Sequence, residues 1–88
     1  MMNMTETVRR EYIQAHVQYF GYIETPALVD LFQITKTQAR NDISNLKQML
    51  GIEFSCRDRA WIGTPVSDVS ARKAAFRVLS TVQKAIDG

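Results

Sequence analysis

Apolar residues recur every three or four positions in three segments of the first fifty residues, and this spacing predicts three helices. The first helix covers residues 5–20 and ends at Gly21, because glycine is common just after a helix. The second is short and begins at Thr25-Pro26, where the threonine hydroxyl is expected to cap the helix and proline suits its first turn. The third follows Thr35 and ends at Gly51.

The pattern changes to short extended runs after residue 51. Residues 52–56 and 60–62 favour strands, and the polar residues 57–59 between them predict a β-hairpin with a basic tip. Tyr22 and Ile23 are also β-prone, but they suffice for only one short strand. The sequence therefore predicts a mainly α fold with a small β-hairpin.

A final helix is predicted after the break at residues 63–65, with Ser67 or Asp68 as its N-cap. Its apolar positions cover a wider arc than one packing surface needs: Phe76, Val78, Leu79, Val82, Ala85 and Ile86. We expect part of this arc to pack on the first helix and close the core. The remainder is expected to form a homodimer interface from Phe76, Leu79, Val82 and Ile86.

The third helix combines a regular apolar stripe with an unusual polar face. The stripe consists of Ala39, Ile43, Leu46 and Leu50. The opposite face carries amides, hydroxyls and a guanidinium but no acid: Thr37, Gln38, Arg40, Asn41, Ser44 and Asn45. In the DNA major groove, amides can pair with adenine and arginine can pair with guanine. This face is therefore a candidate DNA-binding surface.

Two details of this helix can be predicted from its first turns. Residues 35–38 fit the capping-box pattern, in which the Thr35 hydroxyl and the Gln38 side chain each satisfy a free backbone N–H. Asp42 lies close to the apolar stripe, so we expect it to point inward and to pair with a basic residue.

The other reactive side chains form no recognisable catalytic or metal site. His16 has no cysteine or carboxylate cluster at ligand spacing, and we interpret it as structural. Cys56 is the single cysteine, which excludes an intramolecular disulfide and a zinc site of several thiolates; we expect it in a strand, with Trp61 in the core beneath the hairpin. Because no glycine-rich phosphate loop or nucleophile elbow is present, we expect no enzymatic activity, no cofactor and no metal.

Charge is distributed unevenly along the 88 residues, although the formal net charge is only +2. Residues 1–34 carry two basic and four acidic residues, residues 35–63 carry five and three, and residues 64–88 carry four and two. Excess positive charge thus begins with the polar-faced helix, as a polyanion-binding surface requires. No apolar run is long enough for a signal peptide or a membrane span, so we expect a cytoplasmic, nucleoid-associated protein.

The predicted order of helix, short strand, helix, turn, helix and hairpin is that of a winged helix-turn-helix domain. Residues 9–63 resemble the N-terminal DNA-binding domain of DeoR-type and WYL-domain bacterial transcription regulators, on the basis of residues 21–23, 28–32 and 34–43. The resemblance implies three helices and a wing over residues 1–66, with an added C-terminal helix over residues 67–88. Asn41 stands where DeoR-type proteins usually have a second arginine, so their DNA sequence is not implied.

The resemblance and the polar face together predict a sequence-specific double-stranded DNA-binding protein, a repressor that acts by occupying its operator. The expected DNA-binding residues are Thr35, Lys36, Thr37, Gln38, Arg40, Asn41, Ser44, Asn45, Lys47, Arg57 and Arg59. Because the chain stops at Gly88, we expect neither a fused effector domain nor a small-molecule ligand. Two alternatives stay open: a winged helix that serves as a protein-interaction module, and an architectural or replication role on DNA.

Overall fold

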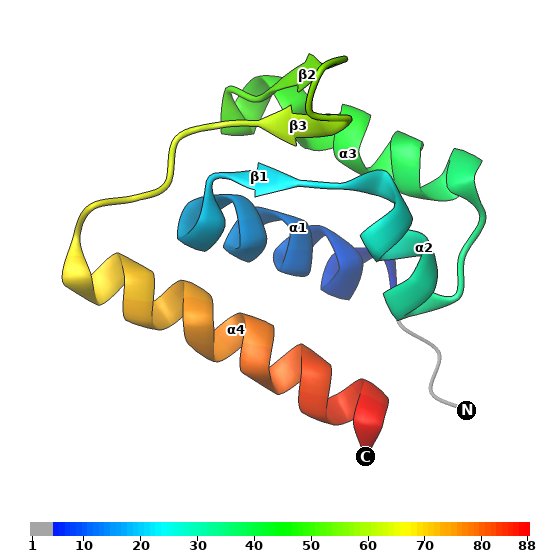
Figure 1. The fold of residues 1–88 in the computed structure, drawn as a ribbon. Helices are drawn as coiled ribbons and strands as arrows, with labels where there is room; N and C mark the ends of the chain where they lie inside the picture. The colour runs from blue at the N-terminus through cyan, green and yellow to red at the C-terminus, as the bar shows by residue number, and fades with distance from the viewer. Residues whose placement is uncertain (1–4) are drawn as a thin grey trace.

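Four helices and a small antiparallel sheet make up residues 5–88, the part of the chain that the computed structural model describes (Figure 1). The elements are α1 (Glu6–Phe20), β1 (Tyr22–Ile23), α2 (Thr25–Phe32), α3 (Lys36–Leu50), β2 (Glu53–Ser55), β3 (Ala60–Ile62) and α4 (Val69–Asp87). The predicted mainly α fold with a small β-hairpin is thus confirmed. Among these residues, no helix combines the length and apolar character needed to cross a membrane.

The helices begin and end largely where the sequence predicts. The Thr35 hydroxyl accepts a hydrogen bond from the Gln38 backbone N–H at 3.1 Å, and Asp68 caps α4 by accepting one at 2.9 Å. Of the two predicted caps of the last helix, Asp68 is therefore the one used. Gly21 and Gly51 follow α1 and α3 with φ of +84° and +64°, a backbone conformation that favours glycine.

The start of α2 differs from the prediction. Thr25 is the first helical residue, and Glu24 occupies the N-cap position without a side-chain hydrogen bond. Thr25 is buried, so its side chain packs inward and does not cap the helix. Pro26 alone sets the first turn, because its fixed φ is helical and its missing N–H would have had no partner within the helix.

β3 lies at the centre of the sheet, with β1 and β2 antiparallel on its two sides. Trp61 of β3 pairs with Ile23 of β1 and with Phe54 of β2. Beyond β3, the Gly63 N–H donates a hydrogen bond to the Gly21 carbonyl at 2.8 Å. The short strand predicted at residues 22–23 therefore extends the hairpin into a three-stranded sheet.

α1 lies between the two parts of the core (Figure 1). On one side it packs with α2, α3 and the sheet in the main cluster, which consists of Ile13, Val17, Ile23, Leu28, Ala39, Ile43, Leu46 and Ile52. On the other side, Ala15 of α1 packs against Ala75 and Leu79 of α4. The last helix thus helps to close the core, as predicted.

Most of the apolar arc of α4 faces inward. Leu79 and Val82 are only 9% and 6% exposed, whereas Phe76 is 53% exposed and Ile86 is partly buried. The expectation that Leu79 and Val82 would remain available to a second chain is therefore wrong, because the chain buries them itself. Of the four predicted dimerisation residues, only Phe76 offers a large exposed apolar surface.

Candidate nucleic-acid interface

α3 presents the predicted polar face to solvent because its opposite face is anchored in the core. Ala39 and Ile43 are fully buried and Leu46 is nearly so, which fixes the rotation of the helix about its axis. Gln38 is partly buried, and the other predicted DNA-binding residues of this segment are exposed: Thr35, Lys36, Thr37, Arg40, Asn41, Ser44, Asn45 and Lys47. The predicted orientation of this helix is thus confirmed.

Seven residues of this face form two rows, as the rotation of about 100° per residue requires, and Asn45 lies beside the central row on the side away from the cations. The central row lies opposite the buried stripe and consists of Thr37, Asn41, Ser44 and Gln48. A row of cations lies along one edge and consists of Lys36, Arg40 and Lys47. Gln48 is exposed but is missing from the predicted set. Gln48 lies seven residues after Asn41 and four after Ser44, and this spacing places it on the same helix face, so the sequence alone could have identified it.

Asp42, the only acid in α3, is withdrawn from the exposed face. Its side chain is 1% exposed and forms an ion pair with Arg9 of α1, in which Arg9 Nε lies 2.6 Å from Asp42 Oδ2. The predicted pairing with a basic residue is thus confirmed. As a result, the solvent-facing side of α3 carries three cations and no acid.

The Gln38 side chain hydrogen-bonds to this carboxylate, with its Nε2 3.1 Å from Asp42 Oδ1. The predicted capping box is therefore only half correct: the Thr35 hydroxyl caps the helix, but the Gln38 side chain points to Asp42. A hydrogen bond to a charged acceptor is stronger than one between neutral groups, which explains why the Gln38 side chain binds the Asp42 carboxylate and not a backbone N–H. Gln38 thus has a structural partner within the chain.

An aromatic contact joins the cationic edge of α3 to the sheet. Lys47 Nζ lies 5.9 Å from the centre of the Trp61 ring, within the range of a cation–π contact. Phe54 of β2 meets the same ring edge-on, with ring centres 5.3 Å apart, and is 50% exposed. Trp61 is partly buried and packs against the main core, close to its predicted position. The hairpin and α3 therefore form one continuous surface.

The β2–β3 turn carries the last two predicted DNA-binding residues, Arg57 and Arg59, and both are exposed. Arg57 Nε lies 3.5 Å from an Asp58 carboxylate oxygen in a surface ion pair, and the Ser55 hydroxyl donates to Asp58 at 3.0 Å. Cys56 is exposed and lies in this turn. Its predicted position in a strand is wrong, because β2 ends at Ser55. Two acids offset the two arginines of the hairpin, so α3 supplies the positive excess.

His16 lies outside this surface and has a structural environment. Its Nδ1–H donates to the Tyr22 carbonyl at 2.6 Å, and its ring lies 4.7 Å from the centre of the Phe20 ring. Burial lowers the pKa of the imidazole, and the bond to the Tyr22 carbonyl and the charge of Glu24 partly oppose this shift. Within residues 5–88, no group of three or more His, Cys, Asp or Glu side chains could hold a metal ion.

No protein-family model matches this chain, and no curated protein sequence matches it either. The resemblance to DeoR-type and WYL-domain regulators therefore stays a prediction. The exposed surface of α3 places hydroxyls and amides in a central row, with cations along one edge and the hairpin beside them. Such a surface is suited to a polyanion that also offers hydrogen-bonding groups.

Proposed function

We propose that this chain is a winged-helix protein that binds double-stranded DNA sequence-specifically and represses transcription by occupying its operator. The observation that carries this proposal is the exposed face of α3, with its row of hydroxyls and amides, its row of cations and no exposed acid. Base pairs present hydrogen-bond donors and acceptors in the major groove, and phosphates line its edges. The two rows of α3 correspond to these two kinds of target.

The dimensions of α3 suit the major groove of B-DNA. Its 15 residues, at a rise of about 1.5 Å each, form a rod about 22 Å long, and the groove is about 12 Å wide. Thr37 and Asn41, in the N-terminal half of the helix, then reach the base edges, where the Asn41 amide pairs with adenine. The cations along the edge of α3 contact the phosphates of one strand.

In this proposal α2 and the hairpin hold α3 in the groove. Residues 33–35 connect α2 to α3, and Gln33 takes a left-handed φ of +55° that permits the sharp turn. Leu28 of α2 and Ile43 of α3 belong to the same buried cluster, so the two helices pack as one unit. The hairpin is the wing, and its two arginines contact phosphates beside the groove.

The cations predict how strongly affinity depends on salt. Five basic residues belong to the proposed interface: Lys36, Arg40, Lys47, Arg57 and Arg59. If each neutralises one phosphate, log K falls with log salt at a slope of about −4.5. Arg57 already pairs with Asp58, so the slope should be somewhat shallower than this limit.

Selection from a pool of random duplexes tests this proposal. The chain is incubated with the pool, bound duplexes are amplified over several rounds, and the enriched sequence is titrated at two salt concentrations. We expect a defined sequence that binds about a thousandfold or more tighter than random DNA. Weak, salt-sensitive binding without enrichment would instead indicate an architectural role. No binding at low salt would leave the protein-interaction alternative.

A further inference from the structure

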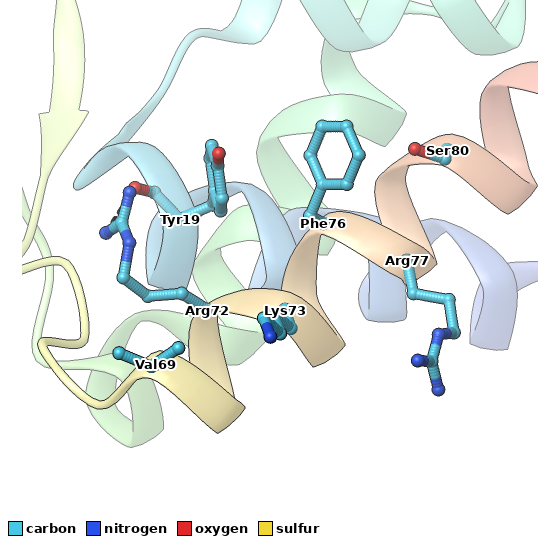
Figure 2. A pocket seen from close by; sticks show the side chains of 7 residues that line it. All are labelled: Tyr19, Val69, Arg72, Lys73, Phe76, Arg77 and Ser80. Carbon is cyan, nitrogen blue, oxygen red and sulfur yellow. Dashed lines mark hydrogen bonds between the residues drawn. The ribbon is translucent and has the colours of Figure 1, made fainter.

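A groove of about 590 Å³ lies between the C-terminal end of α1 and the first half of α4 (Figure 2). α4 packs on α1, and α1 separates it from α3 and the sheet (Figure 1). The groove is therefore remote from the proposed DNA-binding face.

Aromatic side chains form the apolar part of this groove. The Tyr19 ring from α1 and the Phe76 ring from α4 lie with their centres 5.5 Å apart, and Phe76 is 53% exposed. Phe20 continues the aromatic surface, with its ring centre 5.0 Å from that of Tyr19, and is 50% exposed. Two half-exposed phenylalanines around one tyrosine are a surface that gains free energy when a partner covers it.

Within residues 5–88, three of the residues that line the groove are cations and none is an acid. The Arg72 guanidinium lies 4.5 Å from the centre of the Tyr19 ring and donates hydrogen bonds to the carbonyls of Tyr19 and Val66, each at 3.2 Å. These contacts fix its position, so little side-chain entropy is lost when it binds an anion. Lys73 and Arg77 are exposed beside it. The groove thus combines a fixed positive charge with an aromatic floor.

We propose that this groove binds an acidic segment of another protein, with a carboxylate beside Arg72, Lys73 or Arg77 and an apolar side chain on Phe76 and Tyr19. The charge of the groove favours an acidic partner. The aromatic floor favours a peptide over a phosphate backbone, because phosphate offers no apolar group to cover it.

A second copy of this chain fits the groove less well. Stable interfaces between folded proteins use about 20–30 residues on each side, whereas only seven residues of the described part of the chain line this groove. A twofold contact would also bring the same cations of two chains together, which costs free energy. A single extended or helical segment matches the size of the groove better. Such a partner could bind while α3 is on DNA, so this inference goes beyond the proposed function and does not depend on it.

Selection of peptides from a displayed random library against the full chain tests this proposal. The enriched peptides are then synthesised, and their affinities for the wild type and for variants are measured by fluorescence anisotropy. Phe76→Ala truncates the exposed aromatic, and Arg77→Glu reverses one charge. Arg59→Glu makes the same charge change in the distant β2–β3 turn and serves as the matched control. Circular dichroism confirms that each variant is folded.

We expect enriched peptides that combine several acids with an aromatic or large aliphatic residue. Phe76→Ala and Arg77→Glu should each weaken their binding about tenfold or more, and Arg59→Glu should change it less than about twofold. The proposal is overturned if no peptide is enriched, if the enriched peptides lack acids, or if both groove variants bind as the wild type does. It is also overturned if the free chain forms a dimer that Phe76→Ala dissociates, or if Arg77→Glu abolishes duplex DNA binding, because a second copy or DNA would then occupy the groove.

Discussion

Replacement of the buried Asp42 by alanine should destabilise the fold far more than loss of an exposed acid. The Asp42 side chain is 1% exposed, and that of its ion-pair partner Arg9 is 12% exposed. Removal of one member of a buried ion pair typically costs about 3–5 kcal/mol, because the remaining charge loses its counter-ion where water is scarce. Arg9 keeps some contact with water, so we expect the lower end of this range, about 3 kcal/mol.

Such a loss is large for a domain of 88 residues, whose free energy of unfolding should be roughly 4–13 kcal/mol. Urea unfolding, followed by circular dichroism and by the fluorescence of Trp61, the single tryptophan, measures the change. Asp58→Ala is the matched control. The Asp58 side chain is 45% exposed, and its ion pair with Arg57 should contribute less than about 1 kcal/mol.

A double variant separates the effect of a buried charge from a general packing defect. Arg9→Met combined with Asp42→Leu removes both charges and keeps apolar volume in the site, an exchange that often leaves stability almost unchanged. We therefore expect the double variant to be more stable than Asp42→Ala. Asp42 does not act as a buried charge in this way if Asp42→Ala costs less than about 1 kcal/mol, or if the double variant is no more stable than Asp42→Ala.

Three further predictions concern the DNA-binding face and His16. Asn41→Ala should weaken binding to the selected duplex by about 1–3 kcal/mol. The control Met49→Ala, at an exposed site outside the two rows, should change the affinity little. If Asn41→Ala binds the duplex as tightly as the wild type does, Asn41 makes no base contact. Arg40→Ala should lower affinity for all duplexes and reduce the salt slope by about 1, measured by anisotropy across a salt series, and an unchanged slope would exclude a phosphate contact. Burial lowers the pKa of His16, so the folded state binds its proton less readily than the unfolded state, and the free energy of unfolding should fall as pH falls through about 6.5. Urea unfolding at several pH values should show that the free energy of unfolding changes less with pH in His16→Gln than in the wild type. The same pH dependence in both proteins would show that His16 is not the group responsible.

The helices and the hairpin were predictable because local patterns determine them. The helical spacing of Ala39, Ile43 and Leu46 fixes both the existence of α3 and the face that it exposes. The pairing of β1 with β3 was not predictable, since two residues carry no register information. The start of α2 was misplaced by one residue, because an inward-facing threonine and a capping threonine look alike in a sequence.

Part of the candidate interface follows from local spacing, and part depends on contacts between distant residues. Gln48 could have been found from its spacing to Ser44 alone. The partner of Asp42 could be expected only as a basic residue, because Arg9 lies 33 positions away in the sequence. The hydrogen bond from the Gln38 side chain to the Asp42 carboxylate accompanies this ion pair with Arg9. The burial of Leu79 likewise depends on the packing of α4 against α1, which joins residues far apart in the sequence.

An NMR titration with DNA shows which face of the folded chain contacts the duplex, and therefore whether α3 is the DNA-binding helix. Isotope-labelled chain is titrated with the selected duplex, or with a random duplex at low salt if none is enriched, and the backbone amide shifts are followed. We expect saturable changes along the exposed face of α3, from Lys36 to Gln48, and in the turn from Cys56 to Arg59, while the amides around Phe76 stay unchanged. Changes confined to α4, or no saturable change at all, would contradict the assignment of α3 as the DNA-binding helix.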